Sequence, residues 1–201
     1  MGENHQNARL ILASKSPRRS ELLRQAGITF DIIPSRFKEE SMPMMDDPVR
    51  YVGMLSRAKA LEVAATHPDR WVIGADTIVL SNGLVLGKPE DSESARTMLS
   101  RLSGRTHQVY TGFTISCLSR HRELTDVVCT DVSFKTLAPA EIAWYIHTGE
   151  PFDKAGAYAI QGQGAFLVRR INGSYTNVVG LDVCAAELLL TGLGLAARIH
   201  D

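Results

Sequence analysis

The chain has 201 residues, 44% of them hydrophobic, which is enough to bury one sizeable core. Lysine and arginine together number 22, as do aspartate and glutamate, so the formal net charge is zero. This balance argues against a general binder of nucleic acid or of anionic membranes, because such proteins carry a basic excess or patch. We therefore expect a globular protein in which local charge clusters matter more than the total charge.

Signals of export or membrane insertion are absent from the sequence. Residues 1–9 are polar and lack the apolar core of a secretory signal, and no apolar run approaches the roughly 18 residues that span a bilayer. Cys117, Cys129 and Cys184 lie far apart without a Cys-x-x-Cys pair, which favours neither a zinc site nor a disulfide framework. We expect a reduced cytoplasmic protein with no membrane or nucleic-acid partner.

The first third of the chain predicts two strands and two helices. Residues 10–13 form an apolar strand that leads into a helix, with Ser16 as N-cap and Pro17 at the first helical position. A second strand is predicted over residues 30–34. After a polar loop, a longer helix is expected over about residues 47–66, with an aspartate cap and a proline in its first turn.

The middle of the chain predicts a β-hairpin followed by a helix. The β-branched run 71–80 and the short strand 84–86 flank an Asn-Gly turn, which is a strong hairpin signal. Apolar residues at helical spacing then follow a cap at Asp91 or Ser92, and Gly104 is expected to end this helix.

The remaining elements alternate irregularly. We predict strands over 107–118 and 123–137, a helix over 139–147, a strand over 165–169 within the glycine-rich stretch 152–180, and a helix over 182–190. Because helices and strands intermix without a regular β-α-β alternation, the fold class is α/β or α+β with a mixed sheet.

Three cations surround the predicted start of the first helix. Lys15, Arg18 and Arg19 lie at the positive end of a helix dipole, where each is unfavourable by roughly 0.3 to 1 kcal/mol. A bound phosphate would offset this cost, because exposed N–H groups and arginines both favour anions. The alternative is that both arginines are solvated surface residues.

Asp76 lies within the apolar run 72–79. A carboxylate in such surroundings is costly unless it is paired, hydrogen-bonded or bound to a metal, which makes Asp76 a candidate for function. Two alternatives stay open: the side chain faces solvent, or it pairs with a nearby lysine.

Two lysines are candidate phosphate ligands. Lys59 falls within the apolar stripe of its helix, beside Val52 and Val63, where it either points into a site or extends along the surface. Lys88 ends the stretch Gly83 to Lys88, which is one residue too short for a phosphate-binding P-loop and is followed by proline. A kinase or GTPase is therefore excluded, although Lys88 can still contact phosphate.

Glu39 and Glu40 form an acidic pair in a predicted loop, where such pairs are usually only solvated. If one of them meets Asp76, the two carboxylates would suit Mg²⁺, which takes one or two carboxylates plus phosphate oxygens. Together with the basic residues, this set indicates metal-assisted hydrolysis at phosphorus.

Six ordered motifs give the chain a family resemblance. The motifs LILASKSPRRSELL, GADTIV, LGKPED, RLSGRTHQVYTG, EPFDKAGAYAIQGQG and INGSYTNVVGL resemble the Maf family of nucleoside triphosphate pyrophosphatases over about residues 10–190. The resemblance implies one domain over residues 1–201, with a two-lobed α/β mixed-sheet fold shared with the inosine triphosphate pyrophosphatases and a nucleotide cleft between the lobes. It also implies a cytoplasmic enzyme, often a homodimer, that cleaves nucleoside triphosphates to monophosphate and pyrophosphate with Mg²⁺ or Mn²⁺.

The same resemblance implies roles for single residues. Asp76 matches the family's proton acceptor and, with Glu39, its metal site; Lys38 stands where an acidic residue is common, which leaves Glu40 as the alternative ligand. The remaining matches are the dTTP and UTP specificity positions Arg18, Thr77 and Gln161 and the phosphate-site positions Ser14, Arg19, Lys59 and Lys88.

One functional alternative stays open, which is a nucleotide-binding regulator of cell division or septum formation with incidental hydrolysis. Asp76, Lys59 and Lys88 favour an enzyme that clears nucleotide pools, because a pure binder needs no positioned base. The sequence does not rank dTTP, UTP, CTP and modified pyrimidine triphosphates.

Overall fold

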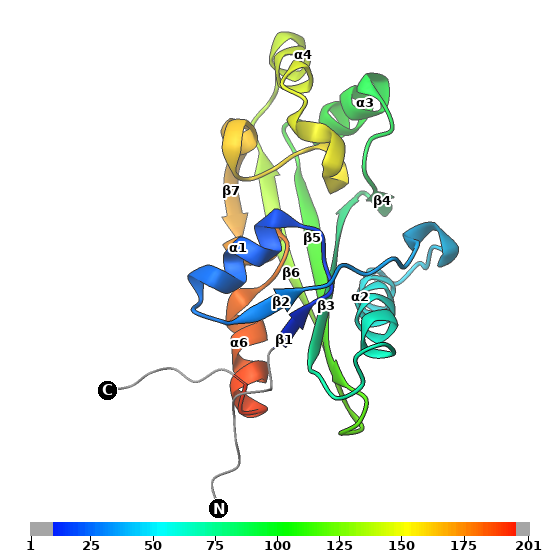
Figure 1. Cartoon of the computed structure of the whole chain (residues 1–201). Coiled ribbons are helices and arrows are strands. Elements are labelled where there is room, and N and C mark those ends of the chain that lie inside the picture. The colour runs from blue at the N-terminus through cyan, green and yellow to red at the C-terminus, as the bar shows by residue number, and fades with distance from the viewer. Residues whose placement is uncertain (1–9, 196–201) are drawn as a thin grey trace, which may run out of the picture. The chain divides into compact units, whose positions relative to one another are not determined.

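The computed structural model describes residues 10–195, so the polar segment 1–9 lies outside the described residues. Within them, one seven-stranded sheet has the order β2-β1-β3-β5-β6-β7, with β4 paired to β3 (Figure 1). The strands are β1 (Leu10–Leu12), β2 (Phe30–Ile32), β3 (Val72–Ser81), β4 (Leu84–Leu86), β5 (Thr106–Cys117), β6 (Arg122–Phe134) and β7 (Val168–Asn172). Strand β1 is parallel to β2 and β3, whereas the β3–β4 and β6–β7 pairs are antiparallel. The predicted α/β class with a mixed sheet is confirmed.

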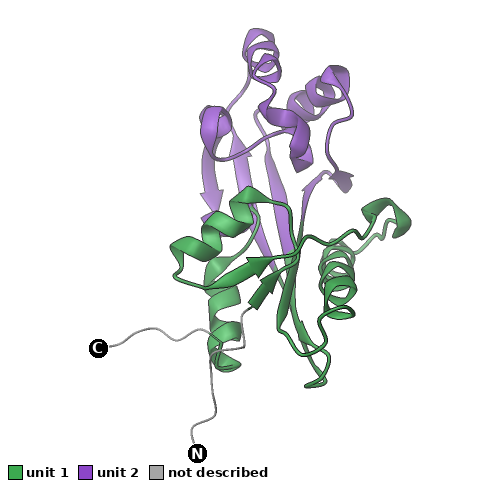
Figure 2. Cartoon of the chain, in the orientation of Figure 1, with its two compact units in different colours: residues 1–76, 112–127, 180–201 green, residues 77–111, 128–179 purple. Residues whose placement is uncertain are grey.

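The chain divides into two compact units, coloured separately in Figure 2. The described part of unit 1 comprises residues 10–76, 112–127 and 180–195, and unit 2 comprises residues 77–111 and 128–179. Strands β3, β5 and β6 each contribute residues to both units. No helix within residues 10–195 combines the length and the apolar character needed to cross a membrane.

Helix starts in unit 1 follow the predicted caps. Ser16 precedes α1 (Pro17–Gln25), and its side chain accepts a hydrogen bond from Arg19 N at 3.4 Å. Asp47 precedes α2 (Pro48–Ala64) and accepts from two backbone N–H groups of the first turn. Asp182, the first residue of the last predicted helix, precedes α6 (Val183–Gly192) and accepts from one backbone N–H group, that of Ala185. Each cap satisfies N–H groups that a helix leaves without an internal partner.

Helix α2 lies in close backbone contact with the sheet. A Cβ atom added to Gly74 of β3 would lie 2.5 Å from Ala60 N, and one added to Gly112 of β5 would lie 2.7 Å from Val52 O. Only glycine therefore permits this approach. The buried cluster beside it consists of Ile11, Ala13, Ala60, Val63, Ala64 and Val72.

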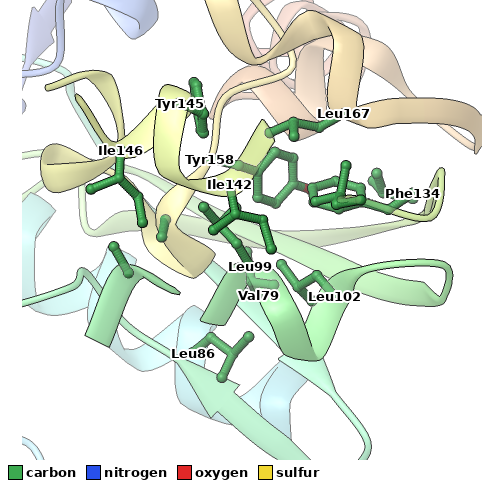
Figure 3. Close-up of a cluster of buried hydrophobic side chains, with 14 of the residues drawn as sticks. Val79, Leu86, Leu99, Leu102, Phe134, Ile142, Tyr145, Ile146, Tyr158 and Leu167 are labelled. Atoms are coloured by element: carbon green, nitrogen blue, oxygen red, sulfur yellow. The ribbon is translucent and has the colours of Figure 1, made fainter. Parts of the chain in front are cut away.

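Unit 2 has its own hydrophobic core, part of which is shown in Figure 3. The predicted hairpin turn is present, with positive φ at Asn82 (51°) and Gly83 (75°). Helix α3 (Ser92–Leu102) begins with a capping box in which Asp91 and Ser94 bond to each other's backbone. Helix α4 (Pro139–His147) is followed by Gly149 in the left-handed region. These elements agree with the sequence prediction.

The glycine-rich stretch differs from the prediction in two respects. Residues Gly162–Leu167 form a 3-10 helix, so β7 begins at Val168 rather than at residue 165. The apolar residues taken for the strand pack instead against α4, where the Phe166 ring lies 5.5 Å from that of Trp144. A short helix, α5 (Tyr175–Val179), was not predicted. It is fixed by distant contacts, since buried Asn177 donates to Val109 O and to Thr130 Oγ1.

Candidate functional site

Lys59 joins two carboxylates in unit 1. It lies on α2 with its side chain 11% exposed, and its Nζ donates to Glu39 Oε1 at 2.7 Å and also to the carboxylate of Asp76. Asp76 is buried on β3, and Glu39 opens a 3-10 helix, Glu39–Ser41, in the polar loop. Of the alternatives for Asp76, pairing with a lysine is the one observed. Both acids are thereby held on a single ammonium group.

Burial makes Asp76 more basic than an ordinary aspartate. Its pKa is raised, with burial as the largest cause, opposed by the Lys59 charge and reinforced by the Glu39 charge. The Arg19 charge acts in the same direction as that of Lys59. A carboxylate in such surroundings is suited to accept a proton from a neighbouring water.

Arg19 is anchored beside the start of α1. Its Nε donates to Gly180 O at 2.8 Å and its Nη1 donates to Ser14 Oγ at 3.2 Å, and Ser14 Oγ also accepts from Ser16 N. Burial lowers the pKa of Arg19, whereas the charges of Asp76 and Glu39 raise it. An arginine keeps its charge throughout the physiological range, so a fixed cation faces the two acids.

Five of the predicted site residues therefore meet within unit 1, namely Ser14, Arg19, Glu39, Lys59 and Asp76. Arg18 is half-buried at the start of α1, and its charge acts on Arg19. Of the two loop glutamates, Glu39 is the one that contacts Lys59, while Glu40 is exposed. The sequence predicted these residue types, and the fold brings them together.

The other three predicted residues belong to unit 2. Thr77 Oγ1 lies 2.9 Å from Thr111 Oγ1, Lys88 is exposed after β4, and Gln161 is exposed before the 3-10 helix Gly162–Leu167. Since the hydroxyl proton of Thr111 is directed to the carbonyl of Asn177, Thr77 is the donor in the threonine pair. The roles of these residues in substrate binding stay predictions.

Tyr51 is a residue of this region that the sequence analysis missed. It is buried on α2, and its pKa is raised by burial first and then by the negative charges of Asp76, Glu39 and Glu40. Its phenol thus lies within the electrostatic reach of the acids. Its position two helical turns before Lys59 is the sequence signal that could have indicated it.

The chemistry of these donors fits a magnesium-type ion. Asp76 and Glu39 supply hard oxygen ligands, and Mg²⁺ is commonly bound by one or two carboxylates, with water and substrate phosphate completing its shell. Within residues 10–195 there is no group of three or more histidine, cysteine, aspartate or glutamate side chains placed to hold a metal. A closed structural metal centre is therefore not built from the described residues, whereas a two-carboxylate site is compatible with them.

A family model and curated relatives that match nearly the whole chain indicate one family. The model of the family described as Maf-like protein matches residues 9–193. A dTTP/UTP pyrophosphatase of Geobacter sp. (strain M21) is 50% identical over 188 residues, which cover 94% of this chain and 97% of that protein. Proteins of the same name from Syntrophus aciditrophicus (strain SB) and Myxococcus xanthus (strain DK1622) are 49% and 50% identical, covering 92% of this chain and 90% and 93% of theirs. A solved nucleoside-triphosphatase, a dITP/XTP pyrophosphatase of Mycobacterium abscessus, is 14% identical with a TM-score of 0.42, covering 70% of this chain and 95% of that one.

Proposed function

Since the chain belongs to the Maf-like protein family, we propose that it is a nucleoside triphosphate pyrophosphatase that hydrolyses dTTP and UTP to the monophosphate and pyrophosphate. The observation that carries the proposal is the ion-paired group of buried Lys59 and Asp76 with the partly exposed Glu39, and with Arg19 beside it. A buried, paired acid that is more basic than usual is costly to maintain, and such groups concentrate at reactive sites. The reaction itself is proposed because relatives about half identical over nearly the whole chain are named dTTP/UTP pyrophosphatase.

The basic residues are proposed to bind the triphosphate. Arg19 and Ser14 would contact phosphate oxygens from the start of α1, where N–H groups and the helix dipole also favour an anion. Lys59 would exchange part of its contact with the carboxylates for a phosphate oxygen. The family resemblance implies phosphate binding for Lys88 as well.

Asp76 and Glu39 are proposed to hold a divalent cation, Mg²⁺ or alternatively Mn²⁺. Such an ion, when bound, supplies Lewis-acid polarisation of phosphoryl oxygens. Asp76 would accept the proton of the attacking water, which is the role that the family resemblance implies for it. Attack at the α-phosphorus then releases pyrophosphate.

Arg18, Thr77 and Gln161 are proposed to select the pyrimidine base. Thr77 donates its hydroxyl proton to Thr111, so the lone pairs of Thr77 are the part of this group suited to accept from a base N–H. Uracil and thymine carry such a donor at N3, whereas cytosine carries an acceptor there. We also propose, from the family resemblance, a homodimer located in the cytoplasm.

A substrate panel tests the proposed function. Pyrophosphate release would be measured with dTTP, UTP, CTP, ATP and GTP, each with Mg²⁺ and with excess chelator. We expect release from dTTP and UTP that requires the metal. A chain that binds dTTP without releasing pyrophosphate would contradict the proposal and favour the regulatory alternative.

The substitution Asp76→Asn tests the proposed base. We expect kcat for dTTP to fall by about 100-fold or more, the usual contribution of a general base, while dTTP binding stays measurable. Asp126→Asn is the matched control, because Asp126 is an exposed aspartate of the same unit. Near-normal turnover of the Asp76 variant would remove Asp76 from the mechanism.

A further inference from the structure

In unit 2, the side chains of Glu150 and Tyr145 accept hydrogen bonds from the backbone on either side of Gln161, and these two side chains are called the cradle below. Residues Ile160 to Gln163 contain three consecutive exposed positions, Gln161, Gly162 and Gln163, so packing against a core does not fix them. The backbone at either end of the segment is instead bonded to two side chains from outside it, Glu150 and Tyr145.

Glu150 binds the backbone that follows Gln161. Its Oε2 accepts from Gln163 N at 2.9 Å, and its Oε1 accepts from Gly164 N at 2.9 Å. An ionised carboxylate has only acceptor sites, so two adjacent N–H groups that point the same way can both be satisfied by it. Although burial raises the pKa of Glu150, these bonds and the neighbouring Lys154 bring it below its ordinary value, which keeps the group charged near neutral pH.

Tyr145 connects the two ends. Its hydroxyl donates to Glu150 Oε1 at 2.9 Å and accepts from Ala159 N at 3.1 Å. The backbone before Gln161 is therefore linked to Glu150 through the Tyr145 hydroxyl, whereas the backbone after Gln161 bonds to Glu150 directly. Lys154 holds the backbone of Glu150, because its Nζ donates to Glu150 O at 2.6 Å.

Two glycines allow the turn to lie close to Glu150 and Tyr145. A Cβ at Gly162 would lie 2.7 Å from Glu150 Oε2, and Gly162 has a φ of +69°. A Cβ at Gly164 would lie 2.4 Å from Ala159 O and 2.6 Å from the Tyr145 hydroxyl. The turn is thus fitted tightly around the two side chains, and its conformation depends on them.

We propose that Glu150 and Tyr145 are positioning residues that set the location of Gln161 for recognition of the nucleotide base. The inference rests on the proposed function, in which Gln161 contacts a pyrimidine. The carboxylate of Glu150 accepts from three donors and holds a turn whose tip is exposed. These bonds order the exposed side chain of Gln161 before the nucleotide binds. Loss of this order would weaken base selection and leave the phosphate chemistry of unit 1 in place.

The test compares Glu150→Gln and Tyr145→Phe with the unchanged chain. Either substitution removes at least one bond of the cradle, since an amide nitrogen cannot accept from Gln163 N or Gly164 N and phenylalanine has no hydroxyl. We expect KM for dTTP and UTP to rise by about tenfold, the scale of one lost hydrogen bond to a charged group, with kcat within about threefold. KM for GTP should not change, so the pyrimidine preference falls.

The matched control is Glu141→Gln. Glu141 is a carboxylate of the same unit that also accepts from a backbone N–H, that of Ala138, and pairs with Lys135, yet it has no bond to the Gln161 segment. This variant should keep the unchanged KM values. Amide hydrogen exchange at Gln163 and Gly164 reports independently whether the cradle has opened.

The outcomes separate the inference from the proposed function. If exchange at Gln163 and Gly164 accelerates while KM and base preference are unchanged, the positioning role is refuted. It is also refuted if kcat and thermal stability fall and KM rises together for all nucleotides, because that is the result of a purely structural role. An unchanged chain that releases no pyrophosphate from dTTP or UTP overturns the proposed function, and this is visible before any variant is made.

Discussion

His107 illustrates how strongly one buried residue depends on its protonation state. It is 2% exposed in the core of unit 2, its Nε2 lies 2.7 Å from the Tyr158 hydroxyl, and the Phe134 and Tyr158 rings pack edge-on at 5.0 and 5.3 Å. Nδ1 is buried and has no hydrogen-bond partner. Burial lowers the pKa of His107 from 6.5 to about 4. The ring is therefore neutral in the folded chain at pH 7.

This shift predicts an acid sensitivity of folding. Between pH 6.5 and about 4 the unfolded chain binds a proton at His107 and the folded chain does not, so the free energy of unfolding falls as the pH falls. The loss attributable to His107 reaches about 3 kcal/mol near pH 4, and none is expected above pH 6.5.

Urea unfolding at pH 7 and pH 4.5 measures this loss. His107→Gln keeps a polar partner for Tyr158 and removes the titrating group, so the variant should lose less stability between the two pH values. His147→Gln, at an exposed position on α4, should behave as the unchanged chain does. An equal loss in the His107 variant would contradict the assignment.

At the scale of elements, the contact of α2 with β3 determines whether Lys59 reaches Asp76. Gly74 of β3 lies against the backbone of α2, at positions where a Cβ would be 2.5 Å from Ala60 N and 2.6 Å from Ser56 O. Backbone atoms cannot yield in the way that the end of a flexible side chain can. A methyl group there must separate the helix from the strand.

Gly74→Ala should therefore destabilise the chain by about 3 kcal/mol or more and reduce pyrophosphate release, because Lys59 moves away from Asp76 with its helix. Chemical denaturation and the dTTP assay measure the two effects. Gly192→Ala on α6 is the control, since no atom lies within 4 Å of the added carbon there and alanine favours a helix by up to about 1 kcal/mol. Equal stability of both variants would show that α2 tolerates the methyl group.

At the scale of the whole molecule, the two units share three strands. Residues of β3, β5 and β6 belong to unit 1 at one part of each strand and to unit 2 at the other. Unfolding either unit would break hydrogen bonds along strands that the other also uses. We therefore expect one cooperative transition, consistent with the prediction of a single domain over residues 1–201, which itself stays a prediction.

The two tryptophans allow this expectation to be tested, because Trp71 lies in unit 1 and Trp144 in unit 2. In Trp144→Phe the fluorescence reports unit 1, and in Trp71→Phe it reports unit 2. For each variant, the urea midpoint by fluorescence should coincide with its own midpoint by far-ultraviolet circular dichroism. Separate midpoints would show that the units unfold independently.

The sequence by itself determined the elements whose signals are local. Ser16 and Asp47 cap helices, and Asn82 with Gly83 forms the hairpin turn, because caps and turns depend on hydrogen bonds and dihedral preferences within four residues. The ordered motifs also indicated the family, which the family match confirms. Residue types suited to phosphate and a metal were recognisable for the same reason: their chemistry is a property of the side chain.

Only the tertiary structure decided which of these residues meet. Lys59 lies 20 residues from Glu39 and 17 from Asp76, and the cradle of Glu150 closes around amides 13 and 14 residues away. Likewise, β7 begins later than predicted because its preceding apolar residues pack against α4. Such contacts depend on burial and on the approach of backbones at glycines such as Gly74, which no local pattern specifies.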